Sequence, residues 1–325
     1  MSLIAAIESG CSTTGGCSCS CSSKSSVQER AATDVQMLGE GSDPRVTLRV
    51  ARWTGLRYRS HLVTTGSLGL EGAPLLVGPT TTMVVDSEVL RGSADPIIAP
   101  QHGGVARLIE ERAMLRGISI SQQGVAQPIL DFWNQALLPL RGTTYLQNVA
   151  ESAEVVQLSS ELLGGIQPPE EVTRAVDQVL EQQRHFPFRL PPSPVGVGAK
   201  WRFQEALVVN GAHVTQAVEM TLKAVDANQA NIGIVLKQDA PRQAIQNPLA
   251  PGSKAVLESY HNDGGGDVVV DRLTAIVLSG NIVLMARSTL STETAGAKNV
   301  ATLVGATSIQ MTATVLSEED SGAAR

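Results

Sequence analysis

Four cysteines lie close together near the N-terminus, and the rest of the chain contains none. Cys11, Cys17, Cys19 and Cys21 have the spacing C-x5-C-x-C-x-C within a run of Ser, Thr and Gly. Cysteines in such a setting can bind a soft metal, form disulfides in an oxidising compartment, or carry a lipid. A zinc site is disfavoured, because the usual C-x-x-C pair or histidine cluster is missing. The remainder of the chain must fold without disulfides.

Cys11 is the candidate for lipidation. The apolar stretch 3–7 and Gly10 precede it, which resembles the end of a bacterial lipoprotein signal. That stretch is shorter than the usual apolar region of about 7–15 residues, and Glu8 interrupts it. A flexible spacer with incidental cysteines remains the alternative. In either case we expect residues 1–44 to form a flexible leader rich in Cys, Ser and Gly.

No pattern typical of a catalytic or metal site occurs in the sequence. The five histidines do not fall into H-x-x-x-H spacing, and both the phosphate-binding loop and the G-x-S-x-G elbow are missing. His261, Asp263 and Asp267 surround three glycines, but their spacing differs from that of a calcium loop and is more typical of a solvated turn. We therefore expect no catalytic residue, no metal site and no cofactor, and we expect that the protein is not an enzyme.

The composition indicates a globular chain with an aliphatic core. Hydrophobic residues make up 42% of the sequence and aromatic residues 3%, with a formal net charge of -6. A dense Lys/Arg stripe of the kind that binds nucleic acid does not occur, so we expect no nucleic-acid partner. No apolar run is long enough to span a bilayer as a helix. Contact with a membrane is therefore expected only through a lipidated head.

Alternation of apolar and polar residues dominates the second half. Residues 214–225 place Val, Gln, Val, Met, Leu and Ala on one face, and 308–315 alternate in the same way, as strands with one buried face do. Asn210-Gly211 predicts a hairpin, and we expect turns at 262–267 and 279–281. Strands separated in this way reach 11 or 12 residues, which favours a sheet that coils.

The first half mixes strand and helix patterns. Residues 46–53, 56–65 and 80–90 predict strands, whereas 104–115 and 168–185 have helical spacing. We expect an α+β fold in which long curved antiparallel strands, as a half-barrel or two related sheets, pack on two helices. The body would span 45–316, with strand-rich halves 45–165 and 188–316 joined by helix 168–185 and a frayed tail at 317–325.

One short motif stands between the two halves. Residues 188–201 read F-R-L-P-P-S-P-V-G-V-G-A-K-W, and together with 115–124 they resemble a family of uncharacterised bacterial proteins, DUF6263, many of them predicted lipoproteins. The resemblance implies that the motif introduces the C-terminal sheet. Physically, the glycines permit bending and close approach, and Trp201 would fill the start of a core strand. In the alternative, Gly196, Gly198 and Trp201 would line the mouth of a ligand site.

These observations leave two functions open. The first is an extracytoplasmic protein of the bacterial cell envelope, in the periplasm or at the outer membrane, that binds a lipid or other apolar small molecule in a concave sheet. The second is a structural or interaction protein of the envelope with a solid core. The sequence does not identify a protein partner, and fold alone does not decide between the two.

Overall fold

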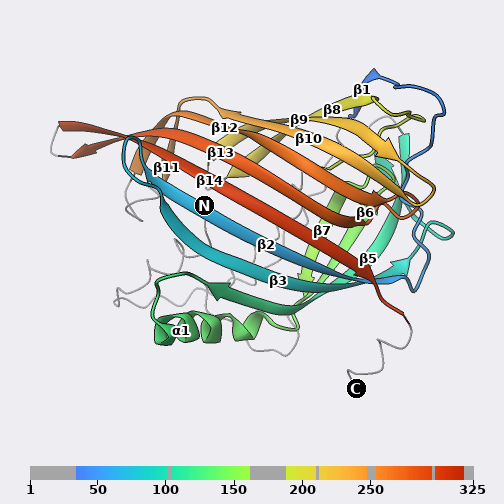
Figure 1. Cartoon of the computed structure of the whole chain (residues 1–325), viewed down its shortest axis with the longest axis horizontal. Coiled ribbons are helices and arrows are strands. Elements are labelled where there is room, and N and C mark those ends of the chain that lie inside the picture. The colour runs from blue at the N-terminus through green and yellow to red at the C-terminus, as the bar shows by residue number, and fades with distance from the viewer. Residues whose placement is uncertain are drawn as a thin grey trace.

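The computed structural model describes residues 34–101, 104–161, 188–209, 212–246, 254–294 and 297–317. Nearly all of this part of the chain belongs to one antiparallel sheet (Figure 1). Its strands are β1 (Gln36–Gly39), β2 (Arg57–Leu70), β3 (Leu76–Arg91), β4 (Ile97–Gln101), β5 (Gly104–Ser121), β6 (Thr144–Ala150), β7 (Val155–Glu161), β8 (Lys200–Val209), β9 (Ala212–Val225), β10 (Gln229–Ala240), β11 (Gln243–Gln246), β12 (Lys254–Asp271), β13 (Val277–Thr294) and β14 (Ala297–Val315).

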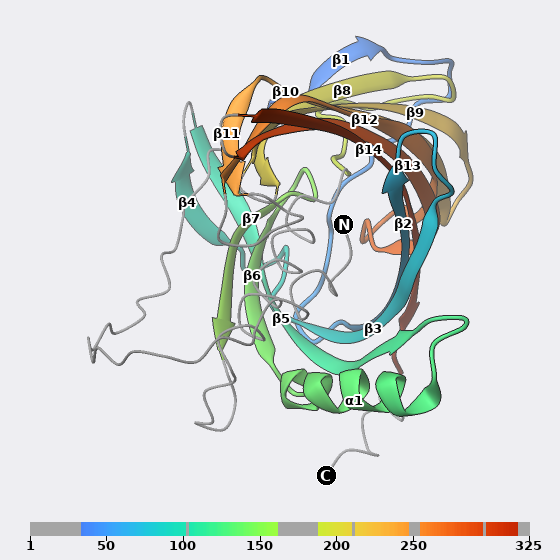
Figure 2. The ribbon, with the colours of Figure 1, turned by 90° about the vertical axis from the view of Figure 1, so that its left-hand side faces the viewer.

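The strand order is β1-β8-β9-β10-β12-β13-β14-β2-β3-β5-β6-β7, with β11 beside β12 and β4 beside β5. Hairpins join most neighbours, and the pairing of β14 with β2 unites the two halves of the chain. The sheet curls so strongly that β3 and β5 lie opposite β8 and β9 (Figure 2). We call the concave side the inner face and the convex side the outer face.

Strand periodicity explains most of the sheet. In β9 the residues from Ala212 to Leu222 alternate between buried and more exposed positions, as residues 214–225 predicted. The longest strand, β14, has 19 residues, which corresponds to about 60 Å. Strands of this length accumulate twist, and the coil brings their apolar faces to the inside.

The predicted α+β class with two packed helices is wrong. In the described residues there is one α-helix, α1 (Gln127–Leu137), followed by a 3-10 turn at Leu138–Leu140. Residues 104–115, predicted as a helix, lie in β5. Here Ile109 is buried in the inner core while its neighbour Leu108 is buried in a separate cluster with Ala150 and Val156. Burial of both faces removes the period-2 signal. The second predicted helix, 168–185, lies outside the described residues.

The two turns predicted at glycines are also wrong, since 262–267 lie in the middle of β12 and 279–281 lie in β13. The glycines serve close packing between strands instead. A Cβ added to Gly266 would lie 1.8 Å from the carbonyl oxygen of Asn281, and one added to Gly265 would lie 2.1 Å from that of Ile234. Glycine in a strand permits such a bend, so this run is where β12 turns around the curl.

Helix α1 protects the free edge of β5. Strand β6 pairs with β5 only as far as Met114, which leaves the end of β5 without a strand on that side in the part of the chain that the structure describes. The side chain of Asn134 accepts from the backbone N–H of Ile120 at 2.7 Å and donates to its carbonyl oxygen at 3.0 Å. This amide makes the pair of hydrogen bonds that another strand would have made.

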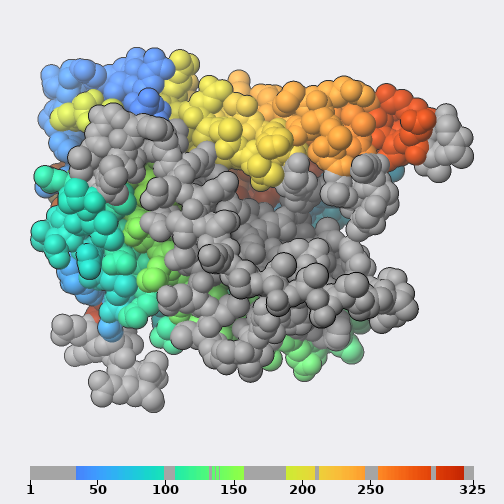
Figure 3. Space-filling view, turned by 180° about the vertical axis from the view of Figure 1, so that it is seen from behind, coloured from blue at the N-terminus to red at the C-terminus, as the bar shows by residue number. Residues whose placement is uncertain are grey.

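The predicted leader, 1–44, is described only from residue 34. Within that part, β1 pairs with β8 through the register of Gln36 with Arg202 and Met37 with Trp201. Seen from behind, this N-terminal segment, in blue, lies at one end of the long axis, and the orange-red end of the β13–β14 pair lies at the other (Figure 3). Most of the predicted tail, 317–325, and residues 1–33 lie outside the described residues.

Candidate ligand-binding face

One row of residues crosses the inner face and changes in character along its length. Each member is the direct cross-strand partner of the next on the neighbouring strand. Polar side chains occupy it on β8 to β12, small residues on β13 and β14, and leucine on β2. The row, which we call the inner row, consists of Glu205, Gln216, Gln238, Asn262, Ala286, Gly305 and Leu68.

The polar members of the inner row form a continuous chain of hydrogen bonds. Gln216 Nε2 donates to Glu205 Oε1 at 2.7 Å, and Gln238 Nε2 donates to Gln216 Oε1 at 2.7 Å. Gln238 Oε1 then accepts from Asn262 Nδ2 at 2.7 Å and from the Tyr260 hydroxyl at 3.1 Å. We call Glu205, Gln216, Gln238 and Asn262 the polar ladder. All four are buried.

The direction of these bonds follows from chemistry. An ionised carboxylate only accepts, so each amide of the ladder must turn its N–H₂ toward Glu205 and its oxygen away from it. The last oxygen of the ladder, Asn262 Oδ1, is buried and has no hydrogen-bond partner among the described residues, and the whole residue is only 7% exposed. Leaving a buried acceptor unpaired costs about 1–3 kcal/mol.

Charged groups anchor the other end of the ladder. Arg189 Nη2 lies 3.5 Å from Glu205 and 3.4 Å from Glu154, with all three side chains buried. The guanidinium also lies 5.0 Å from the centre of the Phe203 ring. Burying charges is tolerated where they are paired and hydrogen-bonded, as here. Near the opposite end, burial raises the pKa of Tyr260, so its hydroxyl remains a donor.

The apolar positions of the inner face fall into two parts with different exposure. Over β8, β9 and β10 the side chains are covered by segments 46–56 and 188–199, and we call this the closed part. There Trp201, Met220 and Ile232 are each 0% exposed. On β14 and β2, which we call the open part, Leu303 is buried, but Ile309 and Leu62 are only partly buried. Leu68 is 36% and Leu70 52% exposed.

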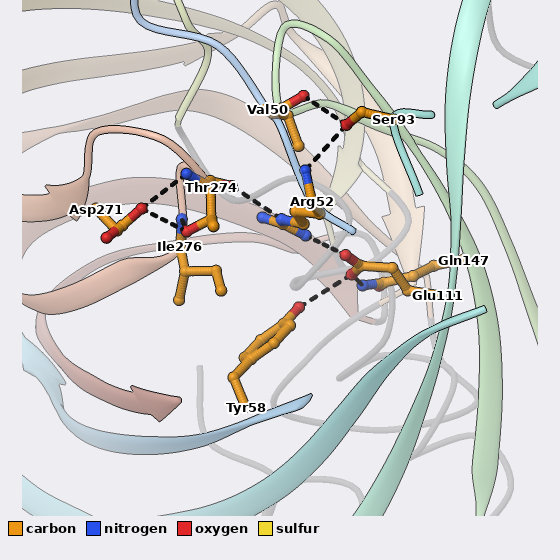
Figure 4. Close-up of polar contacts among 9 residues, drawn as sticks. All are labelled: Val50, Arg52, Tyr58, Ser93, Glu111, Gln147, Asp271, Thr274 and Ile276. Carbon is orange, nitrogen blue, oxygen red and sulfur yellow. Dashed lines mark hydrogen bonds and ion pairs between the residues drawn. The ribbon is translucent and has the colours of Figure 1, made fainter. Parts of the chain in front are cut away.

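A second buried polar cluster lies at the end of the sheet where segment 46–56 enters (Figure 4). Arg52 forms an ion pair with Glu111 of β5 and donates from Nε to the Thr274 carbonyl at 2.9 Å. Glu111 also accepts from the Tyr58 hydroxyl at 2.9 Å and from Gln147 Nε2 at 2.9 Å. The cluster ties the β12–β13 turn to β2, β5 and β6 across the curl.

The pKa shifts in this cluster are those expected of buried groups that stabilise the fold. Burial alone would lower the pKa of Arg52, but the Glu111 carboxylate and Tyr58 raise it above its ordinary value. Burial, followed by the Glu111 carboxylate, raises the pKa of Tyr58 as well. Both groups therefore keep their protons at neutral pH, so neither Arg52 nor Tyr58 supplies a base or a nucleophile.

The three residues predicted as a ligand mouth lie around the start of β8. Gly196 packs against the N-terminal segment, donating from its backbone N–H to the Glu40 carbonyl at 2.8 Å. A Cβ there would lie 1.5 Å from the Ser42 carbonyl oxygen. Gly198 has φ +85 in a turn, and its N–H bonds to the Leu222 carbonyl at 2.8 Å. Trp201 is fully buried and donates from Nε1 to the Arg189 carbonyl at 2.8 Å.

The remaining sequence candidates are dispersed. Cys11 lies outside the described residues. His261 contacts Asp239 at 2.7 Å and Asp263 at 3.5 Å on the outer side of the sheet, whereas Asp267 pairs with Lys223. Within the ranges that the structure describes, no group of three His, Cys, Asp or Glu side chains is placed to hold a metal ion.

The polar ladder was missed at the level of sequence, although a signal for it exists. Gln216 occupies a buried position of β9 between Val214 and Val218, and Gln238 does the same in β10 after Leu236. A polar residue at an apolar position of an alternating strand predicts a buried hydrogen-bonded group. Its partners cannot be read from sequence, because they depend on the register between strands.

Over β2, β3 and β5 the outer face is charged. Arg57 and Arg112 both contact Glu88, and Arg59 and Arg116 both contact Asp86. Such cross-strand ion pairs are typical of a surface in contact with water. This face also carries a groove of about 360 Å³, lined by Thr221, Lys223, Gly233, Ile234, Val235, Gly264, Gly265, Gly266 and Asp267.

In the described residues, no helix is long and apolar enough to cross a membrane.

Comparison with known proteins does not assign a family. No protein-family model matches the chain, and no curated protein matches it. Among solved structures, one similar chain is OmpT of Vibrio cholerae, described as an in-vitro folded outer membrane protein in its trimer form. It has 9% sequence identity and a TM-score of 0.18, and the match covers 79% of this chain and 99% of that one.

Proposed function

We propose that the protein is a non-enzymatic binding protein of the bacterial cell envelope that holds a single lipid against the open part of its inner face. The observation that carries this proposal is the exposure of Leu68 and Leu70 at apolar positions of the inner face. In the closed part, equivalent positions are fully buried. An apolar surface on the concave side of a sheet is where a hydrophobic ligand is bound most favourably.

Residues at the hairpin between β2 and β3 extend this apolar surface. Leu75 is 41% and Leu76 75% exposed, and Leu76 is the cross-strand partner of Leu68. Leucines therefore continue from the end of the sheet onto the inner face, which gives an acyl chain an apolar path. The location in the envelope rests on Cys11 as a site of lipidation, and that modification would hold the protein at a membrane.

The test compares lipid capture by two matched variants. Purified full-length protein is incubated with 1-monoolein micelles, passed through gel filtration and analysed for bound lipid by native mass spectrometry. Leu68→Asp places a charge on the open part, and Val208→Asp places the same charge at an exposed position of β8 on the outer face, where Val208 is 59% exposed. We expect about one lipid per wild-type or Val208→Asp chain and at least tenfold less on Leu68→Asp.

Two results would contradict the proposal. Wild-type protein that elutes without lipid would favour the alternative, a structural or interaction protein of the envelope with a solid core. Equal lipid on both variants would place the binding surface elsewhere. Circular dichroism of each variant establishes that the sheet is intact, which separates loss of binding from loss of folding.

A further inference from the structure

We infer that Asn262 Oδ1 is the headgroup acceptor of the lipid site, and that the site selects uncharged lipids whose headgroup donates a hydrogen bond from a hydroxyl or amide N–H. This inference rests on the proposed function and adds the chemical class of the ligand. It comes from the inner row, in which the polar ladder ends one strand away from the small residues Ala286 and Gly305.

The unpaired oxygen cannot be removed by turning the amide. Glu205 accepts from Gln216, and this fixes the orientation of Gln238, whose Oε1 faces Asn262 and accepts from its Nδ2 at 2.7 Å as well as from the Tyr260 hydroxyl. If Asn262 were flipped, its oxygen would face another oxygen. The ladder therefore presents an acceptor at its free end, and a group that fills this position must donate.

The geometry of the row fits an amphipathic molecule with its head at Asn262. Ala286, Gly305 and Leu68 follow Asn262 on the next three strands, so the distance from Asn262 to Leu68 is about 14 Å across the sheet. Residues without bulky side chains occupy the first two of these positions, and leucine occupies the third. An acyl chain laid along the row would leave the polar end over the small residues and reach the exposed leucines.

The same chemistry disfavours anionic lipids. A carboxylate or phosphate headgroup without a donor would bring a second acceptor to Asn262 Oδ1. The only described charge in direct contact with the ladder's amides is the Glu205 carboxylate, whose positive partner, Arg189, lies at the far end of the ladder. Burying an acceptor against an acceptor leaves both without a partner, which is costly in an apolar setting.

Competition between two lipids with the same acyl chain tests this inference. 1-Monoolein carries two hydroxyl donors, whereas methyl oleate has none. An equimolar mixture is incubated with the full chain, the complex is isolated by gel filtration, and the ratio of the two lipids is measured by mass spectrometry. We expect wild-type protein to retain monoolein over methyl oleate by about tenfold, the preference that one hydrogen bond confers.

The variants separate the acceptor from the apolar surface. In Asn262→Leu we expect the ratio of bound monoolein to bound methyl oleate to fall to about one, while the total amount of bound lipid is preserved. Asn262→Ala serves as a second variant that adds no apolar volume. The matched control is Asn231→Leu. Asn231 in β10 also has a buried oxygen without a described partner. Because it alternates with Ala230 and Ile232 of the inner core, its side chain is on the opposite face of the sheet. This control should keep the wild-type ratio.

Each result of the competition has one meaning. Equal retention of the two lipids by wild-type protein, or an unchanged preference in both Asn262 variants, overturns the inference and leaves the proposed function standing. If neither lipid is retained, the proposed function fails, and the inference fails with it. A preference that is lost in both Asn262 variants and kept in Asn231→Leu supports it.

Discussion

The closed and open parts of the inner face are built from the same alternating strands, yet only the closed part is fully covered by segments that the structure describes. Over β8 to β10, segments 46–56 and 188–199 cross the concave side and bury Trp201 and Met220 completely. Over β14 and β2, Leu68 and Leu70 retain contact with solvent. Alternation therefore determines which side chains face inward, whereas the connecting segments determine which of them become core.

The polar ladder lies beside the closed part and leads toward the open one. It satisfies every described polar group of Gln216 and Gln238 at the cost of one unpaired oxygen at Asn262. A buried network with a single unpaired end is unusual, because partly satisfied networks are costly. This imbalance distinguishes the two parts: the apolar side chains of the closed part are fully covered, whereas the ladder ends toward the open part in an acceptor without a described partner.

Removing a side chain from each part should give the largest contrast. Trp201→Ala empties the closed part and is expected to lower the free energy of unfolding by about 3–5 kcal/mol. Leu70→Ala in the open part is expected to lower it by less than about 1 kcal/mol, because the side chain is already half exposed. Urea unfolding followed by tryptophan fluorescence or circular dichroism measures both. Equal losses would remove the distinction between the parts.

The next largest effect concerns the tie across the curl. Arg52→Met leaves the Glu111 carboxylate buried without its cation and is expected to destabilise the fold by about 3 kcal/mol. The double variant Arg52→Met with Glu111→Gln should recover much of that loss, because it removes the stranded charge. A double variant as unstable as the single one would show that the hydrogen bonds of Arg52, and not its charge, matter most.

A smaller effect is expected on the outer side near the open part. Hydrogen bonds from Lys298, Ser291 and Arg242 lower the pKa of Glu258 to about 2. A depressed carboxyl pKa stabilises the fold above the pKa of the unfolded chain, about 4.3, and this contribution is lost as the pH falls toward 2. The difference in unfolding free energy between wild type and Glu258→Gln should therefore shrink between pH 5 and pH 2. A difference that is independent of pH would contradict this.

The sequence predicted only part of this fold. Strands with one buried face show an alternation of apolar and polar residues that can be recognised, whereas strands with two buried faces do not. The alternation in 214–225 and 308–315 was sufficient to place β9 and the end of β14. It failed at β5, where Leu108 is buried on one side and Ile109 on the other. Glycine at 264–266 indicated a turn but serves a bend within a strand, a distinction that depends on the neighbouring strands.

The candidate site was less accessible to sequence than the fold. Gln216 and Gln238 could be recognised as polar residues on apolar strand faces, but the inner row exists only through the register of seven strands. The pairing of β14 with β2 brings Leu68 into line with Asn262, although the two are far apart in the chain. No local pattern in either half specifies that pairing.

Methyl NMR of the full chain tests most directly whether the open part is the lipid-binding surface. Selectively labelled Ile, Leu and Val methyl groups are followed during titration with 1-monoolein. Leu68, Leu70 and Ile309 should shift with a common affinity, while Leu222 and Ile232 in the closed part stay unchanged. Shifts confined to the closed part, or to Val235 and Val283 on the outer face, would contradict binding at the open part.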